Sequence, residues 1–119
     1  MTLKSEIGQI GEDLACEYLI NKNYRIVDRN LRKQWGEIDI IATDKQKTLV
    51  FVEVKTMRNN PSDLKPEDNL TSAKLIKLKR SASMFAGFNP QLIDDNIGWR
   101  IDLVTVFLPS KEIKHYENI

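Results

Sequence analysis

The feature that most limits how this chain can fold is a pair of strand-forming segments separated by a short polar turn. Residues 36–43 (GEIDIIAT) and 48–56 (TLVFVEVKT) are rich in β-branched and aromatic residues, and the turn DKQK lies between them. This pattern predicts an antiparallel hairpin. Pairing Thr43 with Leu49 closes it with a loop over residues 44–48.

The charged residues of this hairpin are expected to meet on one face. Side chains alternate across a strand, so Glu37 and Asp39 share a face, and so do Glu53 and Lys55. In this register Asp39 lies opposite Glu53 and Glu37 lies opposite Lys55, with the Cβ atoms of opposed residues roughly 4.5–5.5 Å apart. The other face is apolar and is expected to enter the core, through Ile38, Ile40, Val52 and Val54.

Two opposed carboxylates repel each other, and a divalent cation between Asp39 and Glu53 would remove that repulsion. Mg²⁺ or Mn²⁺ suits such oxygen ligands, with Glu37 as a further ligand or a group just behind them. Lys55 could then hold the attacking water or contact a phosphate. The alternative is a solvent-facing strand with a cross-strand charge network. The acid-x-Lys pattern does not decide between them, because the chain contains it three times, at residues 53–55, 63–65 and 112–114.

Composition narrows the class of protein. A chain of 119 residues predicts one domain, over residues 1–119. Its single cysteine and single histidine exclude an internal disulfide and a self-contained Cys/His zinc site. No apolar run is long enough to span a membrane, and the first residues do not resemble a secretion signal. We therefore expect a cytoplasmic protein without a membrane partner.

The remaining segments predict a mixed α/β fold. Apolar residues at helical spacing indicate two helices, and a polar loop with two prolines precedes the second one, which is expected to stop at Gly87. The predicted helices cover residues 5–21 and 71–86, the loop 57–69, and the further strands 24–31, 99–108 and, at an edge, 112–119. The order is α-β-β-β-α-β, with a sheet flanked by helices.

Basic residues are concentrated in two segments of a nearly neutral chain. Residues 25–33 hold four basic residues and one acidic residue, and residues 70–86 hold four basic residues and no acidic residue. Lys74 and Lys77 lie on one face of the second predicted helix. These segments predict a phosphate-binding face, and the alternative is an ordinary solvated surface.

Three segments together resemble a known family. GQIGEDLACEYL, GEIDIIA and LVFVEVKT resemble the YraN-like family of small bacterial proteins, which in turn resembles archaeal Holliday-junction resolvases and the PD-(D/E)xK nuclease superfamily. The resemblance covers most of the chain and implies a restriction-endonuclease-like fold. By position it implies metal ligands at Asp39 and Glu53, a catalytic lysine at Lys55, and a further catalytic acid at Glu12 on the first helix.

The same resemblance implies residues that contact nucleic acid. Lys74 matches a basic position near the start of the second helix, and Lys77 is expected beside it. Family members often carry arginine directly after VEVKT, where this chain has Met57, with Arg58 one position later. Ile38 stands where the superfamily name implies proline.

Three interpretations of function remain open. The first is a Mg²⁺- or Mn²⁺-dependent endonuclease that acts on DNA, including branched or structured DNA. The second is a nucleic-acid-binding protein of the same fold that does not cleave and serves in a DNA repair or uptake complex. The third is a structural protein without a nucleic-acid partner. The resemblance to resolvases also implies a homodimer.

Overall fold

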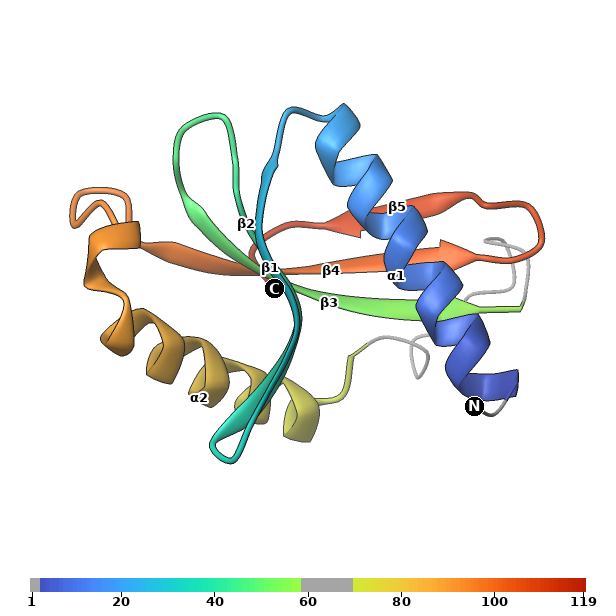
Figure 1. Ribbon diagram of the computed structural model, residues 1–119, viewed down its shortest axis with the longest axis horizontal. Helices are drawn as coiled ribbons and strands as arrows, with labels where there is room; N and C mark the ends of the chain where they lie inside the picture. The colour runs from blue at the N-terminus through green and yellow to red at the C-terminus, as the bar shows by residue number, and fades with distance from the viewer. Residues whose placement is uncertain (1–2, 59–69) are drawn as a thin grey trace.

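The computed structural model describes residues 3–58 and 70–119 and confirms the mixed α/β fold class (Figure 1). Part of the predicted loop over residues 57–69 lies outside the described residues, and Met57 belongs to a strand. The elements are α1 (Leu3–Asn21), β1 (Arg25–Lys33), β2 (Gly36–Thr43), β3 (Leu49–Met57), α2 (Ser72–Phe88), η3 (Pro90–Leu92), β4 (Trp99–Phe107) and β5 (Ile113–Tyr116).

The five strands form one sheet in the order β1-β2-β3-β4-β5. β3 and β4 are parallel, and every other neighbouring pair is antiparallel. The connection through α2 explains this difference, because parallel neighbours need a crossover long enough to return to the same end of the sheet. The short connections elsewhere produce hairpins. The predicted edge strand is confirmed as β5, beside β4.

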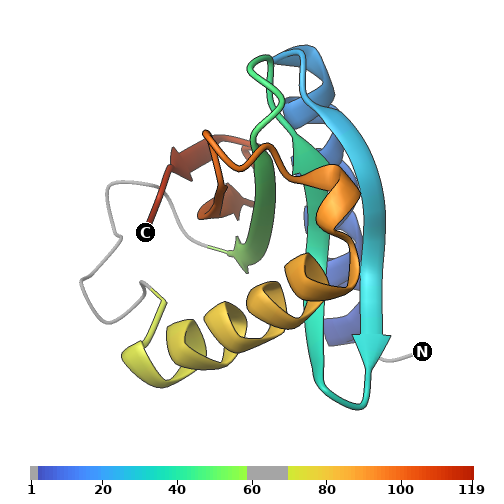
Figure 2. The ribbon, with the colours of Figure 1, turned by 90° about the vertical axis from the view of Figure 1, so that its left-hand side faces the viewer.

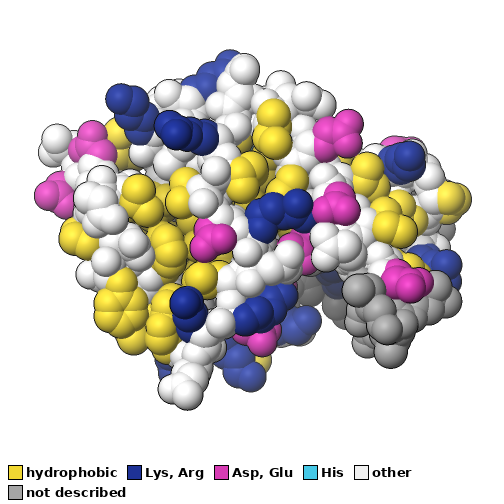
Figure 3. Space-filling view, viewed as in Figure 1, with side chains coloured by type: hydrophobic (Ala, Val, Ile, Leu, Met, Phe, Trp, Pro, Cys, Tyr) yellow, Lys and Arg dark blue, Asp and Glu magenta, His cyan; other side chains and the backbone are white. Residues whose placement is uncertain are grey.

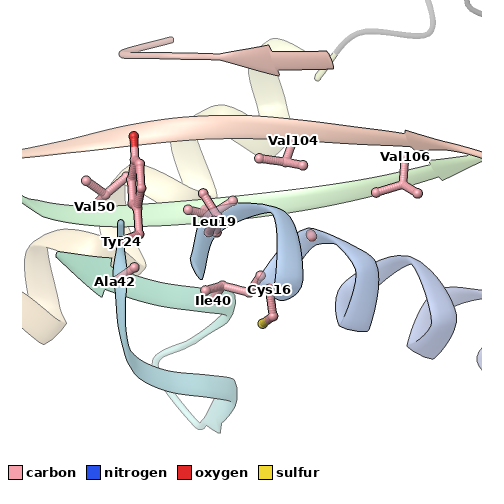
Figure 4. Close-up of a cluster of buried hydrophobic side chains, with 10 residues drawn as sticks. Cys16, Leu19, Tyr24, Ile40, Ala42, Val50, Val104 and Val106 are labelled. Carbon is pink, nitrogen blue, oxygen red and sulfur yellow. The ribbon is translucent and has the colours of Figure 1, made fainter. Parts of the chain in front are cut away.

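The two helices cover opposite faces of the sheet (Figure 2). On one face α1 contributes Ala15, Cys16 and Leu19 to a buried cluster with residues of β2, β3 and β4 (Figure 4). On the other face α2 contributes Leu78, Ala82 and Phe85 to a second cluster, as its predicted apolar stripe requires. Each helix therefore buries one side and leaves the other for solvent or ligands.

Gly11 lets α1 approach the sheet closely. A Cβ atom at this position would collide with the side chain of Thr56 on β3, whereas a Cβ atom at Gly8 would meet nothing within 4 Å. The close approach brings the first half of α1, including Glu12, next to the strands that carry the predicted site.

Polar side chains cap both ends of α2, and its C-terminal end differs from the prediction. Thr71 is the N-cap, and its hydroxyl accepts a hydrogen bond from the Lys74 backbone N–H at 3.2 Å. The predicted stop at Gly87 is wrong, because α2 continues to Phe88. Asn89 ends the helix instead, donating from its side chain to the Phe85 carbonyl and from its backbone N–H to the next carbonyl.

Within residues 3–58 and 70–119, no helix is both long enough and apolar enough to cross a membrane.

Candidate active site

The β2–β3 hairpin has the predicted register but opens earlier than predicted. Thr43 pairs with Leu49, and the ladder continues to Ile40 opposite Val52. At Asp39, the next position, β2 leaves β3 and stays paired with β1 alone. The Asp39 carboxylate accepts a hydrogen bond from the Val54 N–H at 2.9 Å, so a side chain replaces the lost ladder bond.

The opening of the hairpin also corrects one predicted core assignment. Ile40 and Val52 lie in the buried cluster beneath α1, and Val54 packs against it, as expected from strand alternation. Ile38 lies instead in the cluster beneath α2, together with Ile41. Ile38 and Ile40 are two positions apart and yet lie on opposite faces, so the alternation of β2 is interrupted at Asp39, where β2 leaves β3.

Asp39 and Glu53 form an acidic pair whose members are both shielded from water. The Asp39 side chain is only 18% exposed, and burial raises its pKa against the opposing effects of the Val54 N–H and Arg32. Burial, followed by the nearby charge of Asp39, raises the pKa of Glu53 to about 7. At neutral pH the pair therefore resists holding two negative charges without a cation.

Glu12 joins this pair from α1. Burial and then the charge of Asp39 raise the pKa of Glu12, and Glu12 in turn raises the pKa of Glu53. Among the described residues, Glu12 Oε1 is one of the buried side-chain atoms that lack a hydrogen-bond partner. Three carboxyl groups from α1, β2 and β3 thus share one electrostatic environment, and one of their oxygens is unpaired.

The acidic pair lies in a pocket of about 580 Å³ between the β1–β2 turn and α2. The acidic lining residues are Glu37, Asp39 and Glu53, and the basic ones are Lys33, Lys74, Lys77 and Arg80. In the view of Figure 3, Lys and Arg side chains gather over the lower part of the molecule, where Figure 1 shows the β1–β2 turn and α2. A concave acidic site with a basic rim can attract a phosphate and hold a cation beneath it.

Positive side chains of the described residues also reach the acids directly. Arg32 Nη2 lies 3.7 Å from Asp39 Oδ1, and the Arg32 side chain is 48% exposed. The charges of Arg32 and Lys74 act to lower the pKa of both Asp39 and Glu53. These side chains therefore partly neutralise the acidic pair.

Lys55 approaches the acids from the other side of Glu53. It lines a smaller pocket, of about 140 Å³, together with Glu53, Lys74 and Thr71. Glu53 and Lys74 line both pockets, so they lie between Lys55 and the larger pocket that contains Asp39.

Two other predicted site residues lie further out. Glu37 is exposed, and in the strand register it lies opposite Arg32 of β1 rather than opposite Lys55 as predicted. Arg58 is exposed just beyond the end of β3 and lines neither pocket.

A second charged group lies at the junction of β4 and β5. Asp102 is fully buried and accepts hydrogen bonds from Arg100 at 3.0 Å and from the Asn118 N–H at 3.0 Å. His115 Nε2 lies 2.8 Å from the other Asp102 oxygen. Burial acts to raise the pKa of Asp102, but these contacts hold it below its ordinary value.

The possible ligand atoms of this second group lie close together, but the group already includes a positively charged side chain, Arg100. Ligand atoms of Asp102, His115 and Glu117 lie within 4.8 Å of one another, the one such group among the described residues. Arg100 contacts Asp102 directly and supplies the positive charge that a metal would bring. Sequence reasoning overlooked the group, although an aspartate inside the apolar segment RIDLVTV was a signal for it.

Comparison with known proteins identifies the family. The model of the uncharacterised protein family UPF0102 matches residues 11–106. A UPF0102 protein of Alkaliphilus oremlandii is 40% identical over 98% of both chains, and one of Caldicellulosiruptor bescii is 39% identical over 93% of this chain and 89% of its own.

Among solved structures, Pyrococcus furiosus SfsA in complex with Ca²⁺ matches with a TM-score of 0.38 and 16% identity, covering 96% of this chain and 63% of that chain. A similarity this low supports no conclusion about fold or function. The matches by sequence, in contrast, confirm the resemblance to the YraN-like family. This chain belongs to the UPF0102 family.

Proposed function

We propose that this protein is a metal-dependent endonuclease that hydrolyses phosphodiester bonds in DNA. The observation that most supports this function is the partly buried set of three carboxyl groups, Glu12, Asp39 and Glu53, beside a basic rim. Carboxylate oxygens are the ligands that Mg²⁺ and Mn²⁺ prefer, and a basic rim attracts the DNA backbone. Branched or otherwise structured DNA is the substrate that the resemblance to resolvases suggests.

The acidic residues suit a divalent cation. Asp39 and Glu53 are the proposed ligands, and Glu12 Oε1 has no hydrogen-bond partner among the described residues. Asp39 raises the pKa of Glu12 and Glu53, so all three carboxyl groups would gain from a nearby cation. Glu37, at the exposed side of the same pocket, is proposed as a further ligand. When bound, the ion would activate a water molecule and neutralise charge on the phosphate.

The basic residues are proposed to position the DNA and the attacking water. Lys55 carries a compact ammonium group next to Glu53, where it can hold the water or a phosphate oxygen. Lys74 and Lys77 line the large pocket and would bind neighbouring phosphates. Arg58, just beyond β3, would contact the backbone outside the pocket.

A DNA-binding protein that does not cleave is the second candidate, within a repair or uptake complex. Arg32 and Lys74 favour it, because they already supply positive charge to Asp39 and Glu53. In that case DNA binding would fall steeply with salt, and Mg²⁺ would stimulate no cleavage.

The test is cleavage of labelled branched, single-stranded and duplex DNA with Mn²⁺ or Mg²⁺. Asp39→Asn is the best variant, because the amide oxygen can still accept the hydrogen bond from Val54. We expect Asp39→Asn and Lys55→Ala to lower cleavage by more than about 100-fold, since even residues behind metal ligands typically cost 10–100-fold.

The matched control is Glu112→Gln, an exposed acid in another acid-x-Lys pattern of the same chain. This variant should cleave like the wild type. Undiminished cleavage by Asp39→Asn would refute the proposed mechanism. Binding without cleavage by the wild type would favour the second candidate. Sedimentation of the wild type, with and without DNA, would test the proposed homodimer.

A further inference from the structure

One aromatic side chain lines the pocket that holds the acids, and a second aromatic ring packs against it. Trp35 lies in the turn between β1 and β2 and lines the same pocket as Asp39 and Glu53. Its ring centre is 5.7 Å from that of Phe88, at the end of α2, with the ring planes at 52°. Trp35 also packs against the core cluster beneath α2, which holds the turn in place.

Packing alone does not account for both aromatic residues. Trp35 is half-buried, but the Phe88 side chain remains 62% exposed beside it, among the large apolar residues that the protein leaves in water. Burial of apolar surface is favourable, so an exposed aromatic ring next to a polar pocket has more to gain from a ligand than from solvent. Trp35 lines the charged pocket and the exposed Phe88 ring packs against it at an angle, so the pair forms an apolar surface at the edge of that pocket.

The charges around the aromatic pair match a nucleic-acid strand. Lys33, next to the turn, and Lys77 and Arg80 on α2 line the pocket with Trp35. Lys74, Lys77 and Arg80 follow each other every third residue, which places them along one side of α2 with a rise of about 4.5 Å between neighbours. A strand that follows this basic row passes from the aromatic pair to the acidic residues.

We propose that Trp35, with Phe88 beside it, stacks on an unpaired nucleobase of the DNA strand bound in this pocket. This inference rests on the proposed function, because it assumes that the basic rim binds the DNA backbone. The bases inside a duplex are already stacked on each other and cannot present a free face to an indole ring. The preferred substrate is therefore DNA with single-stranded nucleotides beside the reacting phosphate, as at an end, a gap, a flap or an open junction.

The test is the affinity for oligothymidine, which has no paired bases, compared with a blunt duplex of the same length. Both are measured by fluorescence anisotropy at fixed salt with a chelator present, so that binding is separated from cleavage. Trp35→Ala should weaken oligothymidine binding by roughly 5- to 140-fold and duplex binding by less than about twofold, since base–aromatic stacking is worth about 1–3 kcal/mol. Trp35→Tyr should keep most of the wild-type affinity.

Two control variants distinguish base stacking from phosphate contacts and from a disturbed fold. Phe88→Ala removes an exposed ring and should weaken oligothymidine binding selectively, even if Trp35→Ala disturbs the turn. Lys77→Ala removes a phosphate contact and should weaken both ligands alike. Unfolding curves of each variant confirm that it is folded.

The outcomes separate this inference from the proposed function. Selective loss of oligothymidine binding in Trp35→Ala and Phe88→Ala supports the stacking surface, whether or not the wild type cleaves. An equal loss for both ligands, or no loss, overturns the stacking surface but leaves DNA binding intact. A wild type that binds neither ligand overturns both proposals.

Discussion

Replacing Glu53 by glutamine should stabilise the folded protein in alkaline buffer. Burial and the charge of Asp39 raise the pKa of Glu53 from 4.5 to about 7 in the folded state. Folding therefore favours the protonated form, and the ionised form costs the folded state free energy. At about 1.4 kcal/mol per pKa unit, this cost reaches about 3 kcal/mol once Glu53 is fully ionised.

The sign of this effect defines the pH range of the test. Below pH 4.5 Glu53 is protonated in both the folded and the unfolded chain, so the cost is absent. The cost grows as the pH rises from 4.5 to about 7 and is complete above that value. Glutamine has nearly the same shape as protonated glutamate and cannot ionise. The advantage of Glu53→Gln should therefore be small at acid pH and largest above neutrality.

The assay is urea unfolding of the wild type and Glu53→Gln across this pH range, with a chelator present because a bound metal would favour the ionised form. Glu37→Gln is the matched control, because Glu37 lines the same pocket but is exposed. It should change the free energy of unfolding by less than about 0.5 kcal/mol at any pH. A stability difference for Glu53→Gln that does not grow with pH, or that has the opposite sign, would refute the argument from burial.

Further predictions concern the packing of α1 and the buried charges of β4. Gly11→Ala should destabilise the protein by about 1–3 kcal/mol because its methyl group meets Thr56, whereas Gly8→Ala should stabilise it by up to about 1 kcal/mol through helix propensity. Thermal unfolding of both variants checks this, and shifts of equal sign would contradict the packing argument. Arg100→Met should cost about 3–5 kcal/mol because it leaves Asp102 buried without its cation. In urea unfolding, the double variant Arg100→Met/Asp102→Asn should lose less free energy of unfolding than the two single variants lose together. Losses that simply add would contradict the ion pair between Arg100 and Asp102.

The elements of the fold could be predicted because their signals are local. The periodicity of apolar residues locates α1 and α2, and the two β-rich segments around DKQK produce β2 and β3 with the register that their turn requires. The end of α2 was missed for an equally local reason. Asn89 caps the helix with its side chain, so Gly87 is not needed as a stop.

The candidate site was harder to predict because its properties come from distant residues. The proximity of Asp39 to Glu53 followed from the hairpin, but the opening of the ladder at Asp39 did not, because β2 stays paired there with β1 and no longer with β3. The aromatic pair of Trp35 and Phe88 joins residues more than fifty positions apart. No spacing along the chain indicates such a contact.

The order of the elements, the β2–β3 register and the positions of the acids and the lysine in the strands follow from the sequence alone, because they depend on neighbouring residues. Three features depend instead on how distant parts of the chain pack: β3 and β4 lie parallel, Glu12 joins Asp39 and Glu53, and Arg100 neutralises Asp102. Burial and electrostatic coupling act through space, and folding brings together the groups that change each other's pKa.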